Sequence, residues 1–202
     1  LWVKLIGNFN AYNLLAIYAT AEKLGLKQLE ILQLLSTLES VEGRFQYLVS
    51  EGKITAIIDY AHTPDALKNV LETINAIRTG NEELITVVGC GGDRDVEKRP
   101  KMGAIAATLS TKVIFTSDNP RSENPDTIIQ DIEAGVPPQH YKKTLAITDR
   151  KQAIKTACQM AKQHDIILVA GKGHETYQEI QGVRNDFDDR KTIQELLIAL
   201  NK

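Results

Sequence analysis

Residues 112–125 read KVIFTSDNPRSENP, a short apolar run followed by a polar loop with two prolines. The apolar run predicts a buried strand, and the polar part predicts the loop that leaves its carboxyl end, the edge where open α/β sheets bind ligands. Pro120 fixes its own φ and biases Asn119 away from helix, so the loop should turn there. The turn would hold Asp118 and Arg121 in defined directions, which suits a ligand with both an amine and a carboxylate. Taken alone, the stretch also fits a solvated connecting loop.

Length and composition limit the possible classes of protein. The 202 residues are 43% hydrophobic, enough for one large domain or for one domain with an appendage. The net charge of -2 and the few aromatic residues argue against nucleic-acid or membrane binding, and no apolar run approaches the length of a membrane span. Cys90 and Cys158 do not form a CxxC pair, so we expect free thiols and a cytoplasmic protein. Because the chain starts at Leu1 without Met, we expect it to be part of a longer protein.

The first 40 residues differ in pattern from the rest. Residues 1–6 resemble the end of a strand, and apolar residues at helical spacing predict helices over 11–24 and 27–38. Two such helices cannot make a core alone, so we expect residues 1–40 to be a small helical remnant of a neighbouring domain. Residues 42–44 (EGR) mark the junction, where we expect a hinge.

From residue 41 onward, strands and helices alternate. A hairpin is predicted first, with strands over 45–49 and 54–59. The later predicted helices span residues 64–77, 100–109, 126–133, 150–163 and 189–200, and the later strands span 84–88, 112–115, 144–147, 166–170 and 177–180. This alternation predicts one α/β domain over 41–202, with a Rossmann-like, mainly parallel, doubly wound sheet.

Residues 59–65 (DYAHTPD) connect the end of a predicted strand to the start of a predicted helix. Pro64 suits the first helical turn, so the free N–H groups there, and His62 beside them, could face an anion. Asp59 ends the strand, where the acidic residue of a nucleotide-binding fold commonly meets ribose hydroxyls. A helix start that binds no ligand is the alternative.

Two further loops are rich in glycine and charge. Residues 89–95 (GCGGDRD) match neither the P-loop nor GxGxxG, but they carry more charge than a tight turn requires. Residues 171–175 (GKGHE) lack a second His or Cys at ligand spacing, so no protein-bound metal is expected. We expect Lys172 to be solvated. The acids before the last helix should cap its N-terminus; they are Asp186, Asp188 and Asp189.

Six motifs together resemble the C-terminal portion of the Mur ligase family, in particular its diaminopimelate-adding members. Each is weak alone, but they follow the family's order across almost the whole chain. They are residues 9–13 (FNAYN), 42–45 (EGRF), 59–64 (DYAHTP), 89–95 (GCGGDRD), 118–121 (DNPR) and 171–175 (GKGHE).

The resemblance implies part of a three-domain enzyme of peptidoglycan synthesis. In these ligases ATP, with Mg²⁺, phosphorylates the carboxylate of a UDP-N-acetylmuramoyl dipeptide, and the amine of meso-diaminopimelate then attacks. Residues 1–40 would be the last helices of the central ATP-binding domain, and 41–202 the amino-acid-binding domain. We expect a monomer. The chain has no P-loop, so we expect it to be inactive by itself.

The resemblance also implies binding roles for particular residues, none of them a covalent catalyst. Those expected around diaminopimelate are Arg94, Asp118, Asn119, Pro120, Arg121, Gly171 and Glu175. Those expected around ATP are Asn10, Asn13, Arg44, Asp59 and His62.

The choice of amino acid should depend on Arg121. Diaminopimelate carries one more carboxylate than lysine, and a guanidinium can hold a carboxylate through two parallel hydrogen bonds. Arg121 could instead pair with Glu123 or Asp118 and never meet substrate. A lysine-adding Mur ligase, a folylpolyglutamate synthetase fragment and a non-catalytic nucleotide- or amino-acid-binding module are the alternative functions. The DNPR loop counts against the first two.

Overall fold

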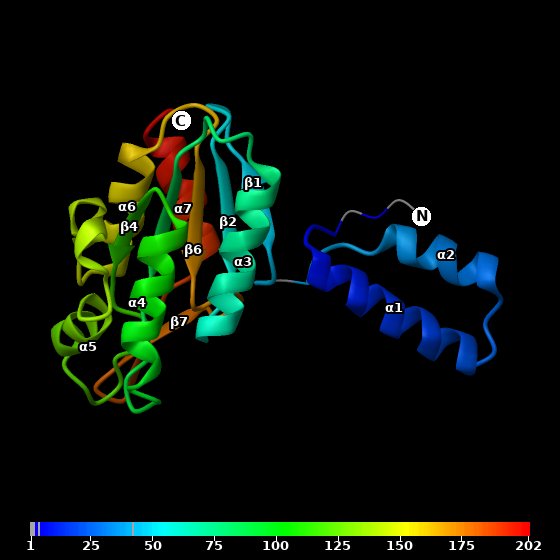
Figure 1. The fold of residues 1–202 in the computed structure, drawn as a ribbon, viewed down its shortest axis with the longest axis horizontal. Coiled ribbons are helices and arrows are strands. Elements are labelled where there is room, and N and C mark those ends of the chain that lie inside the picture. Colours follow the sequence, from blue (N-terminus) through cyan, green and yellow to red (C-terminus); the bar gives the residue numbers. More distant parts are fainter. Residues whose placement is uncertain (1–2, 4, 42) are drawn as a thin grey trace. The chain divides into compact units, whose positions relative to one another are not determined.

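The structure is a computed structural model that describes residues 1–202 except 1–2, 4 and 42; for Asn8 and Phe9 it describes the backbone alone. The chain divides into two compact units, Leu1–Val41 and Glu42–Lys202 (Figure 1). The strand end predicted for residues 1–6 lies partly outside the described residues, and those described there are not in a strand. Glu42, the first residue of the predicted hinge, also lies outside them.

The first unit contains the two predicted helices, α1 (Asn8–Lys23) and α2 (Gln28–Thr37). They pack through a small cluster of buried apolar residues, Leu14, Ile31 and Leu35. Many other large apolar side chains stay exposed, including Tyr12, Leu15, Leu24, Leu29 and Leu34. The unit therefore buries little apolar surface, as expected of two helices without further partners.

The second unit is built on a six-stranded sheet in the order β1-β2-β6-β3-β4-β5. Its strands are β1 (Gln46–Val49), β2 (Thr55–Asp59), β3 (Leu84–Val88), β4 (Lys112–Phe115), β5 (Thr144–Ala146) and β6 (Ile166–Ala170). The β1–β2 hairpin is antiparallel and every other pairing is parallel, which confirms the mainly parallel α/β fold.

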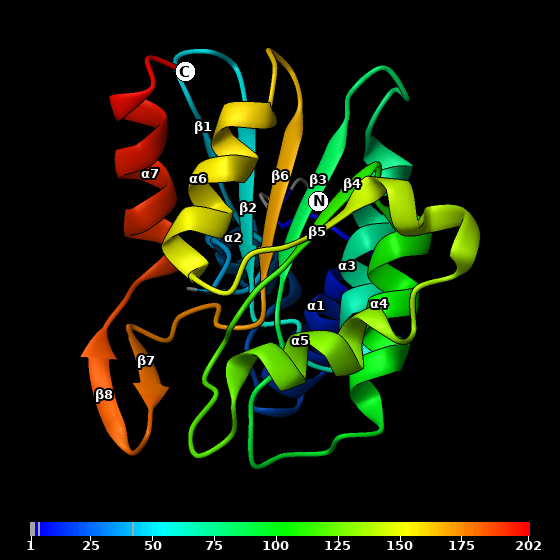
Figure 2. The same cartoon turned by 90° about the vertical axis from the view of Figure 1, so that its left-hand side faces the viewer.

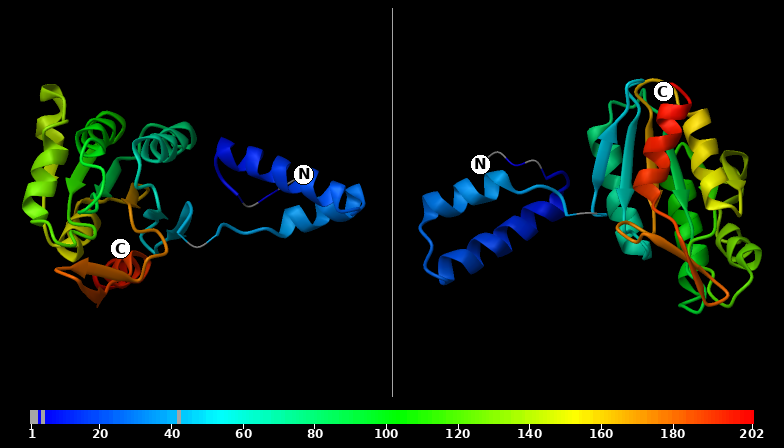
Figure 3. Two further views of the ribbon diagram at one scale, coloured as in Figure 1. Left: turned by 90° about the horizontal axis from the view of Figure 1, so that it is seen from below. Right: turned by 180° about the vertical axis from the view of Figure 1, so that it is seen from behind.

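Helices cover both faces of the sheet. They are α3 (Pro64–Ile77), α4 (Lys98–Leu109), α5 (Pro125–Glu133), α6 (Arg150–Met160) and α7 (Asp189–Ala199). In Figure 2, α3 and α4 lie on one side of the strands and α6 and α7 on the other, and α5 packs beside α4. The view from behind in Figure 3 shows α7, in red, in front of the sheet. All five helices were predicted, although α6 ends three residues before the predicted 163.

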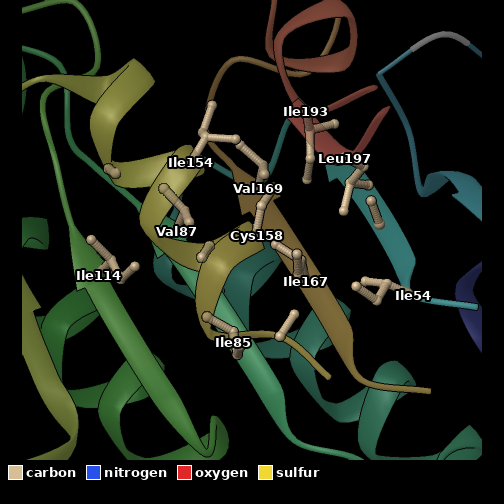
Figure 4. Close-up of a cluster of buried hydrophobic side chains, with 14 of the residues drawn as sticks. Ile54, Ile85, Val87, Ile114, Ile154, Cys158, Ile167, Val169, Ile193 and Leu197 are labelled. Atoms are coloured by element: carbon tan, nitrogen blue, oxygen red, sulfur yellow. The ribbon is translucent and has the colours of Figure 1, made fainter. Parts of the chain in front are cut away.

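The core under α6 and α7 shows why the central strands are apolar throughout. Ile85 and Val87 of β3 point into a cluster with Ile154 of α6 and Leu197 of α7 (Figure 4). The intervening residues of the strand face α3 and α4, because successive side chains of a strand point to opposite faces. Each buried aliphatic side chain contributes about 1.5–3 kcal/mol, so the sheet is a stable base for the loops at its edge.

Two elements were not predicted. A second sheet pairs β7 (Tyr177–Ile180) with β8 (Val183–Asp186), and only β7 was expected. A 3-10 helix spans Pro138–Lys143. All four residues of β8 are exposed, so this strand lacks the apolar alternation by which strands are recognised in a sequence.

The loops that carry the predicted site meet at one edge of the sheet. β2, β6, β3 and β4 are neighbours and run parallel, so the loops after their carboxyl ends lie side by side. The β7–β8 hairpin also joins this edge, because the Arg121 N–H donates to the Glu179 carbonyl at 3.0 Å and the Gln181 N–H to the Arg121 carbonyl at 2.7 Å.

Candidate functional site

A cavity of about 430 Å³ lies among these loops, entirely within the second unit. It includes six of the seven residues predicted to surround the amino acid; Pro120 instead lines a neighbouring depression. The lining residues are Tyr60, His62, Thr63, Gly91, Arg94, Asp95, Lys98, Asp118, Asn119, Arg121, Gly171, Glu175 and Tyr177.

Arg121 is held in place by backbone contacts. Its φ of 51° lies in the left-handed region, and its Nη1 donates to the Gly92 carbonyl at 2.7 Å. Within the described residues it pairs with neither Glu123 nor Asp118: the Glu123 carboxylate accepts from Arg99 at 2.8 Å instead. The guanidinium therefore lies at the cavity wall with neither of these carboxylates bound to it.

The loop that contains Arg121 is bonded to the loop at residues 89–95. The Asp93 carboxylate accepts from the Ser122 hydroxyl at 2.7 Å and from the Ser122 N–H at 3.2 Å, and these bonds lower the pKa of Asp93. The Asp93 N–H donates to Glu123 at 2.5 Å in return. Arg94 follows directly, and its Nη1 donates to the Asp93 carbonyl at 3.3 Å. The two guanidinium groups thus lie on loops that fix one another.

Lys172 was expected to be solvated, and that prediction is wrong. The side chain is fully buried, with 0% exposed. Its Nζ lies 2.9 Å from Asn119 Oδ1, 3.3 Å from Glu175 Oε2 and 3.6 Å from Asp118 Oδ1. A buried ammonium needs partners of this kind, because desolvation otherwise disfavours its charge.

Asn119 connects this cluster to the hairpin. Its Nδ2 donates to Glu175 Oε2 at 2.8 Å, and its Oδ1 accepts from the Glu179 N–H at 3.0 Å as well as from Lys172. Both ends of the amide are therefore engaged within the protein. Asn119 lines the cavity, but its amide orients Glu175.

The glycines on either side of Lys172 explain how the chain turns inward. Gly171 has φ 118° and Gly173 has φ 54°, both in the region that favours glycine. A Cβ on Gly171 would lie 2.5 Å from Asp118 Oδ2, and one on Gly173 would lie 2.7 Å from the Tyr60 Cβ. A lysine between two glycines at the end of a buried strand is the signal that could have revealed this buried position.

Arg44 and His62, both predicted to lie near ATP, lie close to the ring of Tyr60. The Arg44 guanidinium lies 5.3 Å from the centre of the Tyr60 ring, and the His62 ring lies 4.5 Å from it. His174, which was not predicted to be part of any site, lies 5.2 Å from the same ring. Thr63 caps α3 by accepting from the Ala66 N–H at 3.3 Å.

The other predicted ATP residues have internal hydrogen bonds. Asp59 is 6% exposed, and its Oδ2 accepts from the Phe45 N–H at 2.7 Å. Burial raises the pKa of Asp59, although backbone hydrogen bonds oppose the rise. In the first unit, Asn13 Nδ2 donates to Asn10 Oδ1 at 3.2 Å, so these two residues share one face of α1.

A buried ion pair supports the strand ends behind the cavity. Arg150 donates to Asp189 through Nε at 2.8 Å and Nη2 at 2.7 Å, and Nη2 also reaches the Ala170 carbonyl. Burial opposes the charge of Arg150, but Asp189, together with the charges of Asp118 and Glu175, outweighs that effect and raises the pKa of the arginine. The predicted capping role is therefore wrong for Asp189, and Asp186 lies in β8. Asp188 does cap α7, by accepting from the Lys191 N–H at 3.0 Å.

The described residues also limit other kinds of site. Among them, no cluster of three or more His, Cys, Asp or Glu side chains could hold a metal ion. No helix in the described part of the chain is long and apolar enough to cross a membrane. Cys90 and Cys158 are free and buried, and burial raises the pKa of each thiol to about 12.

Comparison with known proteins gives consistent results. The sequence profile described as "Mur ligase, glutamate ligase domain" matches residues 43–173. The UDP-N-acetylmuramoyl-L-alanyl-D-glutamate--2,6-diaminopimelate ligase of Cytophaga hutchinsonii is 59% identical over 201 residues, which are 100% of this chain and 41% of that protein. The Parabacteroides distasonis protein of the same name is 57% identical over 194 residues, 96% of this chain and 40% of that protein. The chain thus spans about two fifths of the length of these relatives.

Solved structures agree. A structure of a UDP-N-acetylmuramoyl-L-alanyl-D-glutamate--2,6-diaminopimelate ligase is 39% identical with a TM-score of 0.76, covering 100% of this chain and 41% of its own. The folylpolyglutamate synthase of Thermotoga maritima, at 21% identity and a TM-score of 0.61, covers 84% of this chain and 37% of its own. At that identity the likeness concerns the fold alone.

Proposed function

This chain belongs to the Mur ligase family, and from that premise we propose that it is the amino-acid-binding part of an ATP-dependent ligase of peptidoglycan synthesis. The proposed reaction joins meso-diaminopimelate to UDP-N-acetylmuramoyl-L-alanyl-D-glutamate, as the names of the relatives suggest. Residues 1–40 would be the last helices of the central ATP-binding domain, and residues 41–202 would bind the amino acid.

The distribution of charge in the cavity is the observation that carries the proposal. Its lining carries three carboxylates, on Asp95, Asp118 and Glu175, and three cations, on Arg94, Lys98 and Arg121. Such a lining suits a zwitterion better than a polyanion or a polycation. We propose that Arg121 holds a carboxylate of diaminopimelate through two parallel hydrogen bonds, with Arg94 nearby, while Glu175 receives an ammonium.

The proposed role in the reaction is positioning. ATP, with Mg²⁺, supplies the phosphoryl group that activates the dipeptide carboxylate in the full-length enzyme. The residues of this chain then orient the attacking amine, which can supply several kcal/mol of the reduction in the barrier. Near ATP the proposal places Asn10, Asn13, Arg44, Asp59 and His62. A monomer in the cytoplasm, where ATP is available, completes the proposal.

The direct test uses the full-length ligase that carries this chain. We expect ADP release that depends on both the UDP-linked dipeptide and diaminopimelate, with a product one diaminopimelate residue heavier by mass spectrometry. Lysine would leave Arg121 without its counter-charge, so it should be used about 30- to several-thousand-fold less well, corresponding to about 2–5 kcal/mol. Equal use of both amino acids would contradict the proposed role of Arg121, and preferential use of lysine would favour a lysine-adding ligase. Binding of either amino acid without amide formation would favour a non-catalytic module.

The isolated 202-residue chain provides a second test. It contains no P-loop, so we expect neither ATP hydrolysis nor amide formation from it. Sustained, magnesium-dependent turnover by the purified chain would contradict this division of roles.

A further inference from the structure

We infer that Lys172 is a positioning residue that fixes the Glu175 carboxylate and the Asn119 amide for the incoming amino acid. The inference rests on the proposed function, since it assigns Lys172 to the same cavity. It goes beyond that function because Lys172 does not line the cavity, and its role would be exerted entirely through its neighbours.

The geometry leaves the ammonium no room to bind substrate. Lys172 is fully buried, and its Nζ is surrounded by Asn119 Oδ1 at 2.9 Å, Glu175 Oε2 at 3.3 Å and Asp118 Oδ1 at 3.6 Å. An ammonium has three N–H donors, and here acceptors face them from two different loops. Lys172 therefore ties the loop after β4 to the loop after β6.

One oxygen of Glu175 is left for a ligand. Its Oε2 accepts from both Lys172 and Asn119, and in the part of the chain that the structure describes no partner of Oε1 is found. The Glu175 side chain is 19% exposed, and the residue lines the cavity. The two internal donors would thus turn Oε1 toward the cavity, where it can receive one ammonium group.

The charge of Lys172 also determines the net charge of the cavity wall that Asp118 and Glu175 form. Asp118 and Glu175 lie within 3.6 Å of the same ammonium, so the three groups together carry a charge of -1. Without the cation, the two neighbouring carboxylates would repel each other. The wall therefore matches a ligand that presents a single ammonium beside its carboxylate, which is the head group of an α-amino acid.

A double-mutant cycle in the full-length ligase tests this inference, with Lys172→Met, Glu175→Gln and the double variant. We expect Lys172→Met to raise the KM for diaminopimelate about tenfold, within the range found for residues of one hydrogen-bond network. The KM for ATP should change by less than about twofold, since no contact of Lys172 with Arg44, Tyr60 or His62 is found among the described residues. In the Glu175→Gln background, loss of Lys172 should add less than about threefold, because its effect passes through the Glu175 charge.

Lys202 provides a matched control. Its Nζ donates to the carbonyls of Cys158, Gln159 and Ala161 at 2.7–3.0 Å, and Lys202 does not line the cavity. Lys202→Met should lower the melting temperature and leave the KM for diaminopimelate unchanged.

The possible outcomes distinguish a failure of the proposed function from a failure of the positioning role of Lys172. Wild-type turnover with diaminopimelate tests the proposed function, whereas the cycle tests Lys172 alone. An unchanged KM in Lys172→Met, or an equal rise in both backgrounds, would overturn the positioning role. Lys172→Gln keeps donors for Asn119 and Glu175 without the charge, so it gives the same readout if the Met variant does not fold. If neither variant unfolds cooperatively, Lys172 is required for folding and the positioning inference is wrong.

Discussion

Arg150 and Lys172 are two buried cations near the carboxyl ends of the strands, with similar burial but different partners. Among the described residues Arg150 forms hydrogen bonds with a single carboxylate, that of Asp189, which is itself fully buried and joined by two hydrogen bonds. Lys172 is shared by two carboxylates and an amide, and all three of those residues line the cavity. The Arg150–Asp189 pair is enclosed by protein and has no net charge. The cluster of Lys172, Asp118 and Glu175 borders the cavity and has a net charge of -1.

The comparison shows that burial of a charge does not by itself identify a functional residue. A neutral pair enclosed by protein has no charge left for a ligand, and it serves to hold the ends of β4 and β6 through the carbonyls of Ser117 and Ala170. A cluster with unequal charges presents the excess to the cavity. We therefore expect changes at Arg150 to affect stability and changes at Lys172 to affect substrate binding.

The largest effect on stability should come from Arg150→Met. Removing one partner leaves Asp189 buried and uncompensated, and such changes cost about 3–5 kcal/mol. Denaturant unfolding of the chain should show this loss in the free energy of unfolding. Replacing both partners, with Arg150→Met and Asp189→Leu, should recover most of it, because no charge is then left buried. A loss of less than about 1 kcal/mol in the single variant would mean that the pair is not the closed element described.

A smaller effect on stability is expected from Glu123, which accepts a hydrogen bond from Arg99. The hydrogen bond from Arg99 lowers the pKa of Glu123, with the Asp93 N–H adding to it. Its contribution is therefore present above the ordinary pKa of 4.5 and is lost as the pH falls through the lowered folded-state value. Glu123→Gln should cost about 1–2 kcal/mol at pH 7, and the difference from wild type should shrink below pH 4.5. A difference that stayed constant between pH 7 and pH 3 would show that the Glu123 charge is not involved.

The smallest expected difference is in the reactivity of the two thiols, Cys90 and Cys158, toward a disulfide reagent. Cys90 lies in the loop after β3, and Cys158 lies on α6 within the hydrophobic core. Burial raises the pKa of both to about 12, so neither should react with a disulfide reagent at pH 8 while the chain is folded. Both should react once it is unfolded. Rapid reaction of Cys90 alone in the native protein would show that the cavity edge opens more than the structure indicates.

Much of the fold could be predicted from local sequence. Thr63 followed by Pro64 fixes the start of α3, and apolar runs such as LITVV at residues 84–88 identify strands buried on both faces. Arg121 and Asp118, which line the cavity, were singled out because a proline turn and opposite charges follow a strand. In each case the signal lies within a few residues of the feature that it predicts.

The parts that were missed depend on distant residues. Lys172 is buried because its acceptors include Asn119, which is 53 positions away in the sequence, and lysine is ordinarily exposed. Asp189 stands where a cap is expected, and only the position of Arg150 reveals the ion pair. The place of β6 between β2 and β3 is likewise a property of the whole sheet, and it is this insertion that brings residues 171–175 between the other loops.

The measurement that tests the central claim most directly is the ratio of kcat/KM for diaminopimelate to that for lysine, in the full-length ligase and in its Arg121→Ala variant. If Arg121 holds the extra carboxylate, the ratio should fall by about 30- to several-thousand-fold, the equivalent of about 2–5 kcal/mol. Lysine use should change little or improve, and Arg121→Lys should restore only part of the loss, since an ammonium lacks the planar fork. An equal loss on both amino acids would contradict the claim, because Arg121 would then support the fold or the end that both substrates share.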